Sequence, residues 1–339
     1  MIESDAVIKF AVVGLGHIGK RHATMVQEHP EAELVALVDV MSKEDLGLSD
    51  LDVPLFPDVE SMLSAGIDLD VVNICTANGL HSAQALKALE HKKHVVVEKP
   101  LGLYTANCEQ VISTALNVSR QVFCVMQNRY SPPSIWLKGL MDEKKLGDIY
   151  MVQLNCYWNR GDQYYKKGSW KGTKEMDGGS LFTQFSHFID MMYWLFGDIT
   201  DINATFENFK HKDSTEFEDS GFVTFKFVNG GMGSLNYSTA VWDSNMESSL
   251  IILGSKGTVK VGGQYMDKVE YCHVEDYELP DLKTPSSKHD YGDYKGSANN
   301  HYFVLKNVID TLKGKTNVST NALEGMKVVN IIERIYAHR

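Results

Sequence analysis

The stretch from Phe10 to Asp39 constrains this chain more than any other, because a glycine pattern lies there between two apolar runs. The run at residues 10–13 (FAVV) leads into Gly14–Gly19 (GLGHIG), a helical spacing of apolar residues follows, and the second run ends at Asp39. Strand, glycine turn, helix and strand, closed by an acid, is the order of a βαβ dinucleotide-binding unit. The sequence therefore predicts that this part of the chain binds a dinucleotide.

Each glycine of the turn has a physical role in such a unit. Gly14 permits the tight turn, Gly16 lets a pyrophosphate approach the backbone, and Gly19 lets the helix pack close to the strand. The first helical residues, His17 and Ile18, present free N–H groups and the positive end of the helix dipole to the phosphates.

Asp39 indicates which dinucleotide the unit prefers. A carboxylate about 20 residues past the last glycine can bind a ribose 2′-OH, and it repels the 2′-phosphate of NADP. No Arg or Lys follows Asp39 until Lys43. The pattern therefore favours NAD.

Length, charge and cysteine usage exclude several classes of protein. At 339 residues the chain is longer than one average domain, so two domains are expected. A net charge of -11 disfavours nucleic acid or an anionic membrane as a partner. The five cysteines are scattered without a C-x-x-C pair, no apolar run reaches about 18 residues, and no signal peptide is recognisable. These features predict a soluble, cytoplasmic protein with reduced thiols.

Strands alternate with helices up to residue 126, which predicts a parallel, doubly wound sheet. Ligands of such sheets bind beyond the carboxyl ends of the strands. The candidate NAD-binding residues therefore lie in the glycine turn and at these strand ends: Gly14, Gly16, His17, Ile18, Gly19, Asp39, Thr76, Asn78, His81, Glu98, Lys99 and Gln127.

Past Arg129 the pattern changes to successive strands with hairpin turns, which predicts an α+β domain with a large, mainly antiparallel sheet. The predicted domains are 1–129, a Rossmann domain, and 130–339, a substrate-binding and oligomerisation domain whose C-terminal helix can pack back on the first. The expected strands are 148–158, 222–228, 232–240, 250–253, 258–261 and 268–274, and the expected helices include 134–144, 180–196, 299–313 and 321–337.

Lys99 stands between Glu98 and Pro100 at a strand's carboxyl end. The following proline keeps Lys99 out of helical geometry, and the bond between them can be cis. A lysine there can bind a substrate hydroxyl and stabilise the developing alkoxide, or shuttle its proton. A solvated lysine at a strand end is the alternative.

His187 lies in the predicted helix 180–196, where Thr183, His187 and Asp190 share one stripe at helical spacing. Histidine is the usual group that accepts a hydroxyl proton near neutral pH. A packed helix histidine is the alternative for His187, and a structural role is the alternative for His81.

A loop rich in cations and aromatic rings precedes Gly178, and such a mixture suits a nucleotide base and a diphosphate, or simply a solvated surface. The loop contains Arg160, Tyr164, Tyr165, Lys166, Lys167, Trp170 and Lys171. No histidine–carboxylate group has the sequence spacing of a metal site, so no metal is expected.

Taken together these motifs resemble the glucose–fructose oxidoreductase, inositol dehydrogenase and MocA (Gfo/Idh/MocA) family over the whole chain. The match rests on Gly14–Gly19, on 75–76 with His81, on Glu98-Lys99-Pro100, and on 178–190 (GGSLFTQFSHFID). The resemblance implies hydride transfer between nicotinamide and a sugar or cyclitol carbinol, with Lys99 and His187 as the catalytic residues. It also implies a homodimer or homotetramer formed through the antiparallel sheet.

One position departs from the family pattern. Many members carry an aspartate four residues before the histidine, where this chain has Thr183. A threonine cannot stabilise an imidazolium as a carboxylate would, so Lys99 could carry more of the proton transfer than His187.

The segment from Tyr164 to Gly179 resembles the nucleotide-sugar branch of the family, the UDP-N-acetyl-2-amino-2-deoxyglucuronate 3-dehydrogenases of surface-polysaccharide (lipopolysaccharide) synthesis. This resemblance implies a UDP-sugar held by the loop 160–171 and the later segment 288–301. The residues expected to bind the substrate are Arg129, Arg160, Tyr165, Trp170, Thr183, Gln184 and His301.

Three other functions stay open from the sequence. The chain could oxidise a free sugar or inositol, it could bind NAD as a regulator without turnover, or it could be an NAD-dependent glycosidase. Intact Lys99 and His187 argue against the regulator, and the missing signal peptide argues against the glycosidase, because such enzymes are typically exported.

Overall fold

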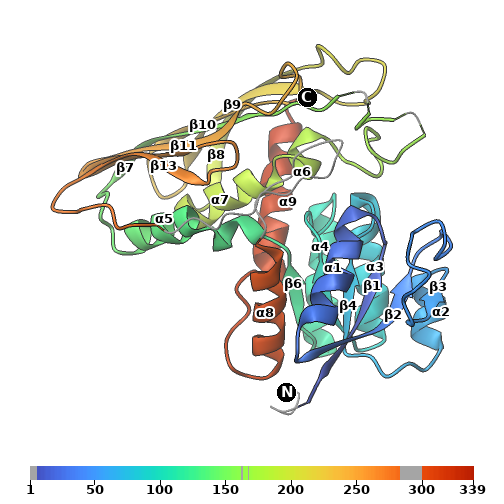
Figure 1. Cartoon of the computed structure of the whole chain (residues 1–339). Helices are drawn as coiled ribbons and strands as arrows, with labels where there is room; N and C mark the ends of the chain where they lie inside the picture. Colours follow the sequence, from blue (N-terminus) through green and yellow to red (C-terminus); the bar gives the residue numbers. More distant parts are fainter. Residues whose placement is uncertain (1–5, 162, 167, 283–299) are drawn as a thin grey trace. The chain divides into compact units, whose positions relative to one another are not determined.

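The computed structural model describes residues 6–161, 163–166, 168–282 and 300–339 (Figure 1). The chain divides into two compact units. The first unit comprises Met1–Met126 and His301–Val329, and the second comprises Gln127–Asn300 and Asn330–Arg339. The sequence interpretation divided the chain after residue 129 and allowed the C-terminal helix to pack back on the first domain. The two divisions differ for residues 127–129 and 301–329.

A backbone contact explains why residues 301–329 belong with the first unit. The amide of Cys124 donates to the carbonyl of Thr320 over 2.9 Å, and Phe123 forms an isolated bridge with Asn321. The ammonium of Lys313 lies 2.6 Å from the carboxylate of Glu31. The returning segment is thus tied to the sheet by hydrogen bonds that no local sequence pattern indicates.

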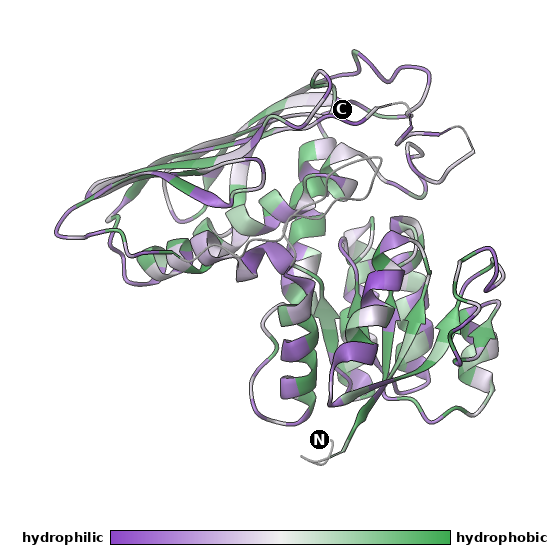
Figure 2. Cartoon of the chain, in the orientation of Figure 1, coloured by the Kyte–Doolittle hydropathy of each residue, from purple (hydrophilic) through white to green (hydrophobic). Residues whose placement is uncertain are grey.

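The sheet of the first unit has the strand order β3-β2-β1-β4-β5-β6, and all of its pairs are parallel. Hydrophobic residues run along these strands (Figure 2), because a parallel sheet with helices on its faces is buried on both sides. The order reverses between β1 and β4, which is the topological switch point where doubly wound sheets bind ligands. The strands are β1 Ile8–Val13, β2 Ala32–Val38, β3 Leu55–Phe56, β4 Val71–Ile74, β5 His94–Val97 and β6 Val122–Cys124.

Helices connect these strands as the alternating pattern predicts (Figure 1). They are α1 His17–Glu28, α2 Val59–Ser64, the 3₁₀ turn η1 Asn78–Leu80, α3 His81–Glu90 and α4 Thr105–Asn117, followed late in the chain by α8 His301–Leu312 and the start of α9 Ala322–Tyr336. The predicted doubly wound Rossmann domain is confirmed.

The sheet of the second unit has the order β13-β12-β11-β7-β10-β9-β8. Its pairs are antiparallel except for β10 with β7, which is parallel. The predicted mainly antiparallel sheet is therefore confirmed. The strands are β7 Ile149–Tyr157, β8 Ile199–Glu207, β9 Ser220–Phe227, β10 Met232–Ser238, β11 Glu247–Gly254, β12 Gly257–Gly262 and β13 Lys268–Val274.

One face of this second sheet carries the unit's core. Residues of β9 alternate between buried and exposed, as a half-buried strand requires. The covering helices include α5 Pro132–Asp142 and α7 Ser186–Phe196 (Figure 1), and the Phe188 ring of α7 packs edge-on against Trp158, with 5.6 Å between the ring centroids. The short turn η2 Gln127–Tyr130 precedes α5.

Two expectations for the second unit were wrong. Residues 199–207 form the edge strand β8, which the sequence interpretation did not include. The predicted continuous helix 180–196 is broken into α6 Ser180–Thr183 and α7, because Phe185 has a non-helical ψ of 2°. Phe185 packs against Trp158 and Tyr237, with centroids 5.5 and 5.3 Å away, so burial of this ring favours the break.

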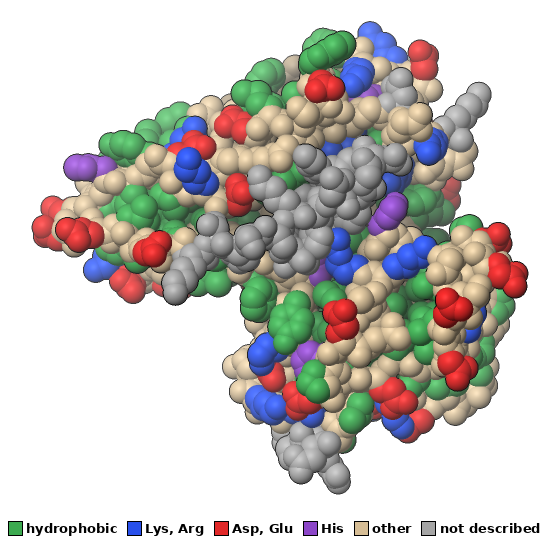
Figure 3. All heavy atoms as spheres, viewed as in Figure 1, with side chains coloured by type: hydrophobic (Ala, Val, Ile, Leu, Met, Phe, Trp, Pro, Cys, Tyr) green, Lys and Arg blue, Asp and Glu red, His purple; other side chains and the backbone are tan. Residues whose placement is uncertain are grey.

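Acidic and basic side chains are interspersed on the described surface that Figure 3 shows. No helix among the described residues is both long and apolar enough to cross a membrane.

Gly325 provides a test of how α9 packs on the first unit. A Cβ atom at this position would lie 2.5 Å from the Sγ of Cys124 on β6. We expect Gly325→Ala to lower the free energy of unfolding by about 1–3 kcal/mol through overpacking, measured by urea denaturation. Gly139 of α5 has open space around its Cβ position, so Gly139→Ala should instead stabilise by up to about 1 kcal/mol. Equal effects of the two variants would contradict the packing argument.

Candidate functional site

The glycine turn of the first unit has the geometry that a bound pyrophosphate needs. Gly14 has a φ of +83°, and a Cβ there would lie 2.7 Å from a methyl carbon of Thr76. A Cβ at Gly19 would lie 1.7 Å from the carbonyl oxygen of Gly14, so α1 can approach the turn only if residue 19 is glycine. Gly16, directly before α1, has nothing within 4 Å of its Cβ position. The space beside Gly16 suits a ligand that approaches the backbone.

Asp39 directly follows β2 and also holds the glycine turn in place. One carboxylate oxygen accepts a hydrogen bond from the amide of Leu15 over 2.6 Å, and the other accepts from the amide of Met41 over 3.0 Å. The acid is therefore fixed beside the turn. A ribose bound there would meet a preformed carboxylate.

His81 braces two strand ends. Its Nδ1 lies 2.7 Å from the carbonyl of Pro100 and its Nε2 lies 3.0 Å from the carbonyl of Thr76. The ring is buried, and burial lowers the pKa of His81. The structure thus places its ring nitrogens against backbone rather than at the surface. Asn78, in the turn η1 before it, is also buried.

Lys99 follows β5 and is half-buried, and its peptide bond to Pro100 is cis. Its backbone N–H donates to the Glu98 carboxylate over 3.3 Å. The lysine thus stands at the carboxyl end of a central parallel strand, where substrates of doubly wound sheets bind.

Glu98 belongs to a buried cluster that the sequence interpretation missed. One carboxylate oxygen lies 3.0 Å from the Nε2 of His22 and 3.4 Å from the Nε2 of His301. Burial alone would raise the pKa of Glu98, but hydrogen bonding to His22 and His301 holds the pKa well below its ordinary value. His301, which was expected to bind substrate, is instead buried beside Glu98 in the first unit.

The cluster has the side chains of a metal site, and its ligand atoms lie within 4.8 Å of one another. The Nδ2 of Asn73 lies 3.1 Å from the Nδ1 of His22. Contacts with Asn73 and Glu98 thus engage both ring nitrogens of His22. We interpret the cluster as a hydrogen-bonded one.

In the second unit His187 and Gln127 lie together. The Nε2 of His187 is 3.1 Å from the amide nitrogen of Gln127, so this ring nitrogen accepts a hydrogen bond and carries a lone pair. Both side chains are buried. The lone pair on Nε2 is what a proton acceptor needs.

Arg129 is engaged inside the second unit. Its guanidinium forms a two-pronged pair with Asp190, with distances of 2.9 Å from Nε and 2.6 Å from Nη2. Both residues are buried, and the guanidinium also lies over the ring of Trp194. This pair joins η2, which carries Gln127, to α7, which carries His187. The position of Arg129 suits a role in holding Gln127 and His187 in place more than direct contact with a substrate.

The cation-rich loop is more internal than the sequence suggested. Arg160 is buried, donates to Gln184 over 2.7 Å, and lies over the ring of Trp158. Tyr165 is also buried, and burial raises its pKa well above the ordinary value. Trp170 is half-buried.

Two predicted substrate residues, Thr183 and Gln184, have different partners in this part of the unit. Gln184 donates to the hydroxyl of Tyr164 over 2.6 Å, and the ammonium of Lys171 lies 3.9 Å from the centre of the Tyr164 ring. Thr183 instead donates its hydroxyl proton to the carboxylate of Asp177. Of the segment 288–301, only Asn300 and His301 lie within the described residues.

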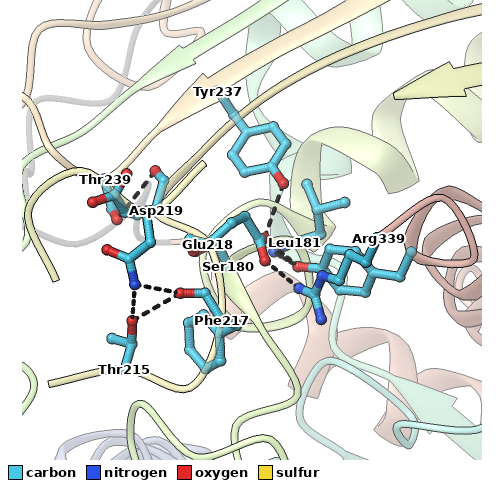
Figure 4. Close-up of polar contacts among 11 residues, drawn as sticks. Ser180, Leu181, Thr215, Phe217, Glu218, Asp219, Tyr237, Thr239 and Arg339 are labelled. Carbon is cyan, nitrogen blue, oxygen red and sulfur yellow. Dashed lines mark hydrogen bonds and ion pairs between the residues drawn. The ribbon is translucent and has the colours of Figure 1, made fainter. Parts of the chain in front are cut away.

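Glu218 anchors the start of α6, and the sequence did not indicate it. Its carboxylate accepts hydrogen bonds from the hydroxyls of Tyr237 and Tyr336 over 2.9 and 2.8 Å and pairs with Arg339 (Figure 4). Tyr336 in turn accepts from the amide of Leu181, the second residue of α6. Burial raises the pKa of Glu218. These partners come from distant segments, so only the folded chain reveals the network.

Comparisons with known proteins agree with this architecture. A model described as "Oxidoreductase family, NAD-binding Rossmann fold" matches residues 8–125, and one described as "GFO/IDH/MocA C-terminal domain" matches residues 135–260. The solved WlbA dehydrogenase of Chromobacterium violaceum, in complex with NADH and UDP-GlcNAcA, is 30% identical with a TM-score of 0.89, over 100% of this chain and 96% of that one. The chain belongs to the Gfo/Idh/MocA family.

Other relatives of this Gfo/Idh/MocA chain include a second WlbA dehydrogenase and a hydratase. The WlbA dehydrogenase of Bordetella pertussis, also solved with NADH and UDP-GlcNAcA, is 29% identical with a TM-score of 0.88, over 98% of this chain and 96% of that one. The 2,7-anhydro-N-acetylneuraminate hydratase of Escherichia coli is 26% identical, over 76% of this chain and 68% of the relative. The predicted family, NAD cofactor and enzyme class are confirmed: this is an NAD-dependent sugar oxidoreductase. The individual site residues stay predictions.

Asp39 offers a direct test of cofactor choice. We expect Asp39→Ala to raise the Kd for NAD about 10-fold, because two oriented acceptor oxygens are lost. The ratio of the Kd for NADP to the Kd for NAD should fall, because the carboxylate that repels the 2′-phosphate is also lost. Titration of protein fluorescence with both cofactors measures this. Asp58→Ala, at the N-cap of α2, is the matched control and should leave both Kd values unchanged. An unaltered NAD/NADP ratio for Asp39→Ala would argue against the assignment.

Glu98 gives the cluster a pH signature. Its folded-state pKa lies below the ordinary value of 4.5, so the ionised carboxylate stabilises the fold above that pH, and this contribution is lost as the pH falls through the folded pKa. We expect Glu98→Gln to lower the free energy of unfolding by about 1.5–3 kcal/mol at pH 7, and the difference from wild type to shrink below pH 4.5. Urea titrations at several pH values measure it, with Glu90→Gln on the exposed end of α3 as control. A difference independent of pH would contradict the charged cluster.

Proposed function

We propose that this protein oxidises the 3-hydroxyl of a UDP-linked N-acetylated uronic acid with NAD, as a step in the synthesis of a surface polysaccharide. The observation that carries the proposal is the likeness to two WlbA dehydrogenases solved with NADH and UDP-GlcNAcA. That likeness extends over essentially the whole chain at 30% and 29% identity, so it includes the second unit as well as the cofactor half.

The proposal gives each unit its own role. In the first unit NAD lies along the glycine turn with its ribose on Asp39, and Lys99 donates to the reacting oxygen and stabilises the alkoxide that develops there. In the second unit His187 accepts the hydroxyl proton on Nε2, once the hydroxyl has replaced the amide of Gln127 as the donor to that nitrogen. NAD held by these residues would supply the acceptor for the hydride from the carbinol carbon.

The second unit also offers groups for a nucleotide diphosphate. Since Arg129, Arg160 and Tyr165 are buried, we assign nucleotide binding to the accessible members of the loop, which are the half-buried Tyr164, Trp170 and Lys171 and the exposed Lys166. Aromatic rings can stack on the uracil, and the ammonium groups suit the diphosphate. A cytoplasmic homodimer or homotetramer completes the proposal.

A dehydrogenase for a free sugar or inositol is the second candidate. An inositol 2-dehydrogenase/D-chiro-inositol 3-dehydrogenase of Halalkalibacterium halodurans is 26% identical over 56% of this chain. In that case UDP would not raise the melting temperature of the protein, because the loop 160–171 would have no nucleotide to bind.

Turnover separates the candidates. Purified protein with NAD should reduce the cofactor on addition of UDP-GlcNAcA, seen as growth of the nicotinamide band at roughly 340 nm, and not on addition of inositols. Lys99→Met should lower kcat about 10²–10⁴-fold while NAD still binds. Lys87→Met, on the exposed face of α3, is the control. Reduction by inositols alone would select the second candidate, and full activity of Lys99→Met would refute the role of Lys99.

A further inference from the structure

Asp177 is a buried acid in the second unit that joins two segments of the proposed substrate side. One carboxylate oxygen accepts a hydrogen bond from the hydroxyl of Thr183, and the other accepts from the amide of Gly172 over 2.8 Å. The side chain is 1% exposed, whereas Thr183 is only half-buried. A fully buried carboxylate thus orients the hydroxyl of a half-buried residue.

The contact fixes the direction of the Thr183 hydroxyl. Thr183 donates its single hydroxyl proton to the side chain of Asp177, so that proton points at Asp177. The backbone carbonyl of Asp177, 3.2 Å away, lies on the same side and shares that proton. Toward any other group, the Thr183 oxygen can therefore only accept a hydrogen bond. A sugar hydroxyl or an acetamido N–H fits this requirement, and a carbonyl oxygen does not.

The place of Thr183 makes this polarity relevant to the reaction. Thr183 ends α6 and stands four residues before His187, and the next residue, Gln184, joins Arg160 and Tyr164. Gly172, the other partner of Asp177, follows Trp170 and Lys171, which the proposed function assigns to the nucleotide. Asp177 thus connects the end of the nucleotide loop to the residue that precedes the proposed base.

We propose that Asp177 is a specificity-determining positioning residue, which acts through Thr183 to present a hydrogen-bond acceptor to a donor on the sugar ring beside the reacting carbon. The inference rests on the proposed function for the identity of the sugar. Asp177 itself does not touch the substrate. It orders the hydroxyl before the sugar arrives, so the site does not lose rotational freedom of Thr183 on binding.

A double-mutant cycle tests the proposal, because it asks whether Asp177 acts through Thr183. The cycle uses Asp177→Asn, Thr183→Val and the double variant. An amide at 177 can turn its N–H₂ toward Thr183 and reverse the direction of the hydroxyl, whereas valine removes the hydroxyl at nearly constant shape. We expect each single variant to weaken sugar binding about 10–100-fold, and the double variant to be no weaker than Thr183→Val.

The readout is the Kd for UDP-GlcNAcA in the presence of NADH, measured by calorimetry beside kcat and KM. Thr183→Ser, which keeps the hydroxyl, should retain binding within about 3-fold of wild type. Asp219→Asn is the matched control: Asp219 is equally buried in the same unit and accepts from the amides of Phe209 and Lys210, not from Thr183. It should lower stability without changing the Kd.

The outcomes separate this inference from the proposed function. The inference is overturned if the losses of affinity in the two single variants multiply in the double variant. It is also overturned if Asp219→Asn loses as much affinity as Asp177→Asn does. Either result would leave Asp177 with only a structural role. If wild type binds UDP-GlcNAcA but does not oxidise it, the proposed function fails, and the cycle on Kd still decides the role of Asp177. If wild type binds only inositols or free sugars, the same cycle is run on those ligands. Failure to bind any of these sugars overturns both.

Discussion

Pairing of buried charge is the constraint on which the candidate site depends. An ionised group removed from water is costly unless hydrogen bonds and opposite charges replace its hydration. Glu98, Asp190 and Glu218 are all buried, and each one joins segments that are distant in the chain. The buried Asp177 joins Gly172 and Thr183, which lie closer to it in the sequence. Each acid keeps its hydrogen bonds only if the segments that carry its partners stay in position. The same pairs that satisfy the charges therefore also fix the strand ends, the turn η2 and the start of α6.

This constraint explains which site residues could be predicted. The glycine turn follows from local sequence, because the positive φ of Gly14 and the contact at Gly19 involve residues a few positions apart. Lys99 is found in the same way, from its place at a strand end. The contacts of Arg129 and Arg160 could not be predicted from local sequence. A charged side chain in a polar stretch gives the same sequence pattern whether it binds a ligand or pairs with a buried residue. The structure shows Arg129 paired with Asp190 and Arg160 bonded to Gln184, and only the folded chain brings these partners close.

The elements that the sequence did not reveal have a similar cause. Strand β8 alternates half-buried and exposed residues at the sheet edge, so few of its positions are strongly apolar. The break between α6 and α7 is set by the long-range packing of Phe185 against Trp158 and Tyr237, which outweighs the helical periodicity of residues 180–196. Residues 301–329 return to the first unit through a hydrogen bond between Cys124 and Thr320. Local pattern predicts elements well where burial is strong and continuous, and poorly where distant partners decide.

The surplus of acids gives a last electrostatic consequence. The chain has a net charge of -11 and NAD is anionic, so long-range attraction does not bring them together. The candidates for binding NAD are therefore short-range groups that act within a few ångströms, such as the backbone N–H groups at the start of α1. Under the proposed function, Lys171 would act in the same way on the nucleotide sugar. Asp190 and Glu218 weaken this attraction little, because Arg129 and Arg339 compensate their charges locally. An acidic protein can in this way hold anionic ligands, while Asp39, whose oxygens accept from the amides of Leu15 and Met41, is held in place for a ribose hydroxyl.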